Sequence, residues 1–154
     1  MIGSSNHDVT VLNSLITTTI DSANGFDEAA NDARSERFQT MFREYASERR
    51  QCVQRLQNEV RRLGGTVEDD GSVKAAAHRT WLNLKDALTG DSDKQIVEEV
   101  ERGEDYIKEK YEMALKDDKL SAETRAAINE AFASVRSGHD RASQLKQSMQ
   151  GTSA

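Results

Sequence analysis

Apolar residues recur every three or four positions along four long segments of the chain, the spacing of one face of an α-helix. These stripes predict helices over residues 8–31, 35–63, 92–116 and 121–148. A shorter stripe in the long connection predicts a further helix over residues 72–88. At about 1.5 Å per residue, each of the four main helices would be roughly 40 Å long. The pattern therefore predicts long helices packed side by side.

Turn and capping residues mark most of these limits. Gly64 and Gly65 follow the second stripe, where glycine commonly ends a helix. Ser92 begins a capping box for the third helix, and Ser121 is a suitable N-cap for the fourth. Residues 31–35 are polar but contain neither glycine nor proline. A break at this point and one continuous helix through it are therefore both compatible with the pattern.

Composition supports an all-α fold. The 154-residue chain contains no proline, 5% aromatic residues and 31% charged residues. A sheet protein would need more aromatic and β-branched residues and more turn signals. We expect one domain over residues 1–154, with its core over about 8–148 and a crossover over about 64–91. Two antiparallel hairpins joined by one long crossover make the ferritin-like form of the four-helix bundle.

Charge is distributed unevenly although the net formal charge is only −6. Residues 34–62 hold eight arginines against four acids, an excess of +4, and residues 91–118 hold eleven acids against five bases, a balance of −6. The acidic total argues against nucleic-acid binding and against attachment to an anionic membrane. Opposite charge on the second and third helices favours a homodimer or another protein partner.

No feature of the sequence indicates export or membrane insertion. The first residues lack a basic region followed by an apolar run, and no stretch approaches the roughly 18 apolar residues of a membrane span. A soluble, cytoplasmic protein is expected. Cys52 is the only cysteine, which excludes an intrachain disulfide and favours a small buried thiol.

Glu104 interrupts the third apolar stripe. The stripe passes through Val100 and resumes at Ile107, so the turn between them should supply a core residue but offers Gly103 and Glu104. A carboxylate directed into a bundle is costly unless it is paired or binds a cation. Arg49 interrupts the second stripe in the same way. A buried pair between Glu104 and Arg49 would explain both interruptions, and a helix tilted toward solvent is an alternative.

Short segments spread over residues 9–145 give the chain a resemblance to one family. These segments are Asp21-Ser22-Ala23-Asn24-Gly25-Phe26, Glu59-Val60-Arg61-Arg62-Leu63-Gly64-Gly65, His78-Arg79-x-Trp81, Leu84-x-x-Ala87-Leu88, Glu101-Arg102-Gly103-Glu104-Asp105 and Val135-x-x-x-His139-Asp140-Arg141. Together they resemble an uncharacterised bacterial family of ferritin-like four-helix-bundle proteins, a domain of unknown function. The resemblance implies the ferritin-like fold and no established activity.

A di-metal site is the chemical hypothesis that a ferritin-like fold raises. Such sites take a Glu from each of two helices and a Glu-x-x-His pair from each of the other two, and they suit iron or manganese. The chain has carboxylates but lacks the Glu-x-x-His pairs. A reduced site could use the four weaker candidates Asp21, Glu48, Glu104 and His139. A hydrogen-bonded structural role is the simpler reading of His139.

The sequence therefore favours a non-enzymatic structural or protein-interaction module that needs no cofactor. No nucleophile elbow, phosphate-binding glycine loop or His-Glu-x-x-His segment is present. The alternative is a degenerate di-metal carboxylate protein that binds iron or manganese. His78 and Trp81, one turn apart in the crossover, are expected to cap the bundle.

Overall fold

The computed structural model describes residues 2–68, 83–90 and 93–152. Four long helices lie within these ranges: α1 (Ile2–Asp32), α2 (Glu36–Arg62), α4 (Asp93–Leu115) and α5 (Ala122–Thr152). Residues 83–89 are also helical, which confirms the end of the helix expected in the crossover. His78, Trp81 and Ser92 lie outside the described residues, so their expected roles as caps stay predictions. The all-α class is confirmed.

The chain breaks between α1 and α2, so the alternative of one continuous helix is wrong. Ser35 adopts an extended conformation, and its hydroxyl accepts a hydrogen bond of 3.2 Å from the backbone N–H of Phe38. This N-cap satisfies one of the free donors at the start of α2. Ser121 caps α5 in the same way, because its hydroxyl accepts from the N–H of Thr124 at 3.3 Å. At the end of α2, Gly64 takes a φ of +74°, which glycine adopts without strain.

Two helix limits differ from the sequence prediction. α1 begins at Ile2 instead of residue 8, and α5 continues to Thr152 instead of ending near residue 148. Each extension is mostly polar. Neither contains a proline or two adjacent glycines, which would end a helix. Apolar periodicity therefore fades before the helix does, and it underestimates the helical length at these ends.

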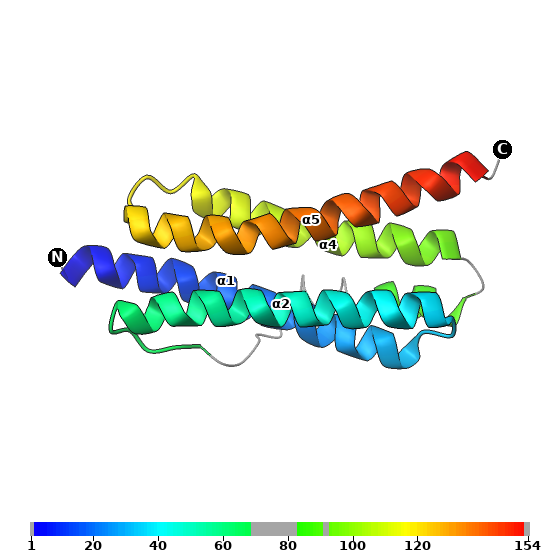
Figure 1. Ribbon diagram of the computed structural model, residues 1–154, viewed down its shortest axis with the longest axis horizontal. Helices are drawn as coiled ribbons and strands as arrows, with labels where there is room; N and C mark the ends of the chain where they lie inside the picture. Colours follow the sequence, from blue (N-terminus) through cyan, green and yellow to red (C-terminus); the bar gives the residue numbers. More distant parts are fainter. Residues whose placement is uncertain (1, 69–82, 91–92, 153–154) are drawn as a thin grey trace.

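The four long helices form two antiparallel hairpins (Figure 1). α1 packs most extensively on α2, and α4 packs most extensively on α5. The hairpins meet where α2 packs on α5 and α1 packs on α4, which places α2 and α4 at diagonal positions. α1 and α5 run in one direction along the long axis, and α2 and α4 run in the other.

Among the described residues, the core consists of two apolar clusters, one toward each end of the long axis. One cluster takes residues from α1, α2, α4 and α5 near the turn that joins α4 to α5, and it includes Leu56, Tyr111 and Ile128. The other lies near the turn that joins α1 to α2 and includes Phe38, Phe42 and Leu88. Between the two clusters, the buried residues of the long helices change from apolar to polar or very small.

Within the described residues, no helix has both the length and the apolar composition that crossing a membrane requires.

Candidate functional site

A polar layer separates the two apolar clusters, and each of the four long helices contributes one residue to it. These residues are Ser22 of α1, Arg49 of α2, Glu104 of α4 and Gly138 of α5. On each helix the residue lies between the last member of one cluster and the first member of the other. We call this set the central layer.

Arg49 and Glu104 form an ion pair inside the central layer. The Arg49 guanidinium donates from Nη2 to Glu104 Oε2, and the two side chains are 0% and 1% exposed. Arg49 also donates from Nε to the hydroxyl of Ser22 at 3.3 Å. The pair confirms the explanation predicted for the two interrupted stripes. Because α2 and α4 are diagonal, this contact links the two hairpins across the centre of the molecule.

The charges of this pair depend on each other. Burial by itself lowers the pKa of Arg49, but the adjacent carboxylate of Glu104 outweighs that effect and raises the pKa above its usual value. Arg49 therefore remains a cation despite full burial. Its Nη1 is buried and has no hydrogen-bond partner among the described residues, so Glu104 carries most of the compensation.

Gly138 and Tyr45 enclose one side of the ion pair. A Cβ added to Gly138 would lie 2.8 Å from Glu104 Oε2 and 3.1 Å from Arg49 Nη2, so only glycine lets α5 approach this closely. The Tyr45 hydroxyl donates to the carbonyl of Gly138 at 2.9 Å. Burial, followed by the charge of Glu104, raises the pKa of Tyr45 to about 12.

Two guanidinium groups lie close to the ring of Tyr45. The Cζ of Arg49 is 5.8 Å from the centroid of its ring, and that of Arg141 is 4.8 Å away. Both distances fall in the range of cation–π attraction. Arg141 in turn pairs with Glu48 at 2.5 Å. The α2–α5 side of the central layer is therefore filled by ion-paired and aromatic side chains of the protein.

The four candidate metal ligands do not converge on one point. Glu104 pairs with Arg49, Glu48 pairs with Arg141, and His139 contacts Asp105 through Nε2. Asp21 lies on α1 at the edge of a cavity described below. Across residues 2–68, 83–90 and 93–152, no three His, Cys, Asp or Glu side chains are grouped closely enough to hold a metal ion. These contacts do not support one reduced site built from the four residues, and that site stays a prediction.

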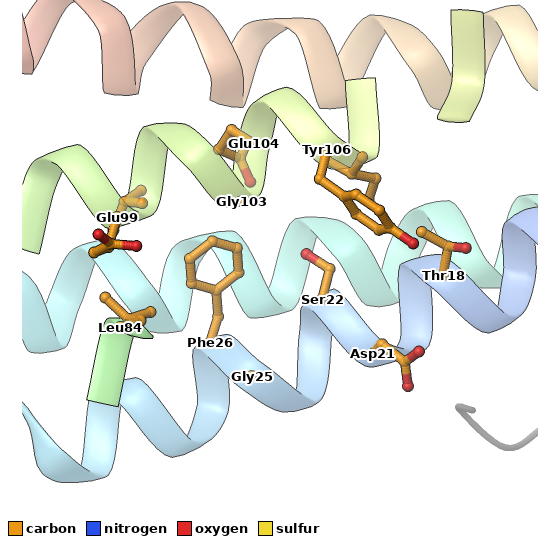
Figure 2. Close-up of a pocket in the computed structure, with 12 residues that line it drawn as sticks. Thr18, Asp21, Ser22, Gly25, Phe26, Leu84, Glu99, Gly103, Glu104 and Tyr106 are labelled. Carbon is orange, nitrogen blue, oxygen red and sulfur yellow. The ribbon is translucent and has the colours of Figure 1, made fainter. Parts of the chain in front are cut away.

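A cavity of about 80 Å³ lies on the opposite side of the ion pair, between α1 and α4 (Figure 2). Glu104 forms part of its wall, and Ser22, which accepts from Arg49, also lines it. Gly25 of α1 and Gly103 of α4 contribute no side chain to fill the space. The same carboxylate thus has a tightly packed side facing α5 and an open side facing α1.

The sequence did not identify Gly138, Ser22 or Glu99 as residues of this region. Gly138 carries the clearest signal, because an isolated glycine inside a helical pattern costs stability and commonly has a packing reason. Ser22 looks like an ordinary polar position. Glu99 is one of several acids in α4, and only its burial beside the cavity distinguishes it.

The chain belongs to a family described as a domain of unknown function, DUF2383, whose model matches residues 8–117. This confirms the resemblance to an uncharacterised family. The matched region covers α1, α2 and α4, and thus both members of the buried ion pair. None of the curated proteins matches the sequence.

Proposed function

We propose that this DUF2383 member is a bacterial, cytoplasmic, ferritin-like four-helix bundle that acts as a non-enzymatic structural or protein-interaction module. In this proposal the Arg49–Glu104 pair closes the bundle centre, where metal-binding members of the ferritin-like class place their ligands. The proposal rests on this pair, because the carboxylate of Glu104, which a metal site would need, already binds the cationic side chain of Arg49.

The arrangement of the helices supports the ferritin-like assignment. Two hairpins are joined by a long connection, and the helices that flank this connection, α2 and α4, run in the same direction (Figure 1). A four-helix bundle with one long crossover has this order of directions. A simple up-down-up-down bundle would place α4 antiparallel to α2.

The contacts that the carboxylates already make support a structural role for the central layer. Glu104 and Glu48 each accept from an arginine, and His139 contacts a carboxylate instead of facing Glu104. A divalent metal would have to displace Arg49 from a buried position and leave its guanidinium without a counter-ion. That displacement is costly, since an unpaired buried charge destabilises a fold by about 3–5 kcal/mol.

Metal uptake tests this part of the proposal against the di-metal alternative. The wild-type protein, purified anaerobically, would be dialysed against Fe(II) and, separately, against Mn(II), and its bound metal measured. We expect less than stoichiometric metal, unchanged in Glu104→Gln and in the exposed control Glu109→Gln. Stoichiometric metal in the wild type that is lost in Glu104→Gln and retained in Glu109→Gln would refute the proposal.

The interaction that we propose is a homodimer formed between the basic α2 of one copy and the acidic α4 of another. α2 and α4 occupy diagonal corners, so each presents its outer face away from the other within one molecule. Their regions carry opposite charge, +4 over residues 34–62 and −6 over residues 91–118, which would steer such an encounter.

Sedimentation velocity tests the dimer. The Debye length is about 30 Å at about 0.01 M salt and about 3 Å at about 1 M salt, so a charge-driven dimer should form in the first condition and dissociate in the second. A monomer under both conditions would remove the homodimer. A dimer that persists unchanged in high salt would remove the electrostatic explanation.

A further inference from the structure

The cavity between α1 and α4 has a distinctive chemical character. Three of its lining residues are acids, Asp21, Glu99 and Glu104, and no Lys, Arg or His is found among the described residues that line it. Much of the remaining wall is apolar and includes Phe26 and Leu84. A concave site with an apolar wall and a few charged groups of one sign is suited to a small amphipathic ligand of the opposite charge.

Glu99 is a carboxylate of this wall that the protein satisfies only in part. Its side chain is 11% exposed, and Arg102 binds only its Oε1. Its Oε2 is buried and has no hydrogen-bond partner among the described residues. A buried acceptor without a donor is costly, and in native proteins it commonly marks a position where a ligand or water supplies the missing hydrogen bond.

The charges of the other groups do not offset this deficit. Arg49 neutralises Glu104 from the far side of the cavity wall. Arg102 is 60% exposed, so water screens its charge where it meets Glu99. Glu99 Oε2 is therefore the buried oxygen of this wall that can accept a further hydrogen bond.

We propose that this cavity binds a small primary alkylammonium ion. The ammonium group donates to Glu99 Oε2, and the alkyl chain lies against Phe26 and Leu84, which line the cavity with Glu99 (Figure 2). The aromatic ring of Phe26 adds apolar surface for the alkyl chain. This binding activity is additional to the proposed structural role and does not depend on it.

The size and the ligand set favour an organic cation over a metal ion. The cavity of about 80 Å³ offers room for roughly five water-sized groups, which matches a short alkylamine. Hard metal cations need several oxygen ligands around one point. The part of the chain that the structure describes groups no three candidate ligands in this way.

Titration of the folded protein with butylammonium, followed by amide chemical shifts in NMR, tests the proposal. 1-Butanol, which has the same chain length but no charge, is the comparison ligand. We expect saturable shifts around residues 25, 99 and 103 with butylammonium, at least about tenfold tighter than with 1-butanol. Glu99→Gln should remove this preference, while Glu98→Gln, one position away and outside the cavity lining, should keep it.

A second variant tests the location without changing a charge. Gly25→Leu places a side chain in the cavity from α1 and should abolish the shifts with both ligands, while circular dichroism shows an unchanged helix content. Three results would overturn the proposal. These are no saturable binding to the wild type, equal loss in Glu98→Gln and Glu99→Gln, or full binding in folded Gly25→Leu.

Discussion

The two sides of Glu104 differ in how the helices meet around one carboxylate. On the α2–α5 side, Gly138 allows backbone contact so close that a single added carbon would collide with Glu104 Oε2. On the α1–α4 side, Gly25 and Gly103 also lack side chains, yet a cavity of about 80 Å³ remains. The same residue type thus permits close packing in one place and leaves open space in the other.

The comparison shows that a mid-helix glycine can be explained only by what faces it. Glycine costs about 1 kcal/mol relative to alanine in a helix interior. At Gly138 this cost is offset by the contacts of Arg49, Glu104 and Tyr45 that the small residue permits. Gly25 and Gly103 instead line the cavity, and their missing side chains leave space there.

The largest effect is expected on the α2–α5 side of Glu104, which we call the tight side, when that carboxylate loses its charge. Glu104→Gln keeps the shape of the side chain but leaves Arg49 buried without a counter-ion. We expect the free energy of unfolding to fall by about 3–5 kcal/mol, measured by urea denaturation. Glu98→Gln, on the same helix and only partly buried, should change it by less than about 0.5 kcal/mol. Equal small effects in both variants would show that the pair contributes little.

A methyl group at Gly138 should disturb the tight side without removing any charge. The new Cβ would lie 2.8 Å from Glu104 Oε2 and 3.1 Å from Arg49 Nη2, so α5 or the ion pair must shift. Overpacking of this kind costs about 1–3 kcal/mol, more than alanine gains in helix propensity. We expect Gly138→Ala to lower the midpoint of thermal unfolding. A raised midpoint would mean that α5 can move away from the pair at no cost.

Alkaline pH should weaken the tight side through Tyr45. Its pKa is raised to about 12, so the folded state holds a proton that the unfolded state releases near pH 10. The free energy of unfolding should therefore decrease with rising pH between about 10 and about 12, by about 1 kcal/mol at about pH 11. Urea denaturation of the wild type and Tyr45→Phe across this range checks the prediction. The decrease should be smaller in Tyr45→Phe, and equal slopes would contradict it.

The smallest effect is expected on the α1–α4 side of Glu104, the open side that contains the cavity. Here the free energy of unfolding should rise instead of fall. Gly25→Ala replaces a helical glycine that lines the cavity and should raise the free energy of unfolding by about 0.5–1 kcal/mol. The same substitution at Gly103 should act similarly. If both variants are instead destabilised as much as Gly138→Ala, the distinction between the two sides fails.

The sequence predicted the helices and the ion pair but not the rest of the central layer. Apolar periodicity located the four long helices, and the interruptions at Arg49 and Glu104 identified two polar groups that needed each other. Gly138 and Ser22 were missed because their importance depends on the axial register of one hairpin against the other. Periodicity along one helix carries no information about that register.

The cavity was unpredictable for a related reason. The acids of α4 are similar in the sequence, and what distinguishes Glu99 is the space left by Gly25 on another helix. The four candidate ligands, Asp21, Glu48, Glu104 and His139, were grouped by their approximate height in the bundle. The structure directs three of them toward different partners around the bundle axis.

A double-mutant cycle on Arg49 and Glu104 tests the central claim most directly. The free energy of unfolding would be measured for the wild type, Arg49→Met, Glu104→Gln and the double variant. If the two charges close the bundle by satisfying each other, each single variant loses about 3–5 kcal/mol and the double variant lies within about 1 kcal/mol of the wild type. Additive losses in the double variant would contradict that claim.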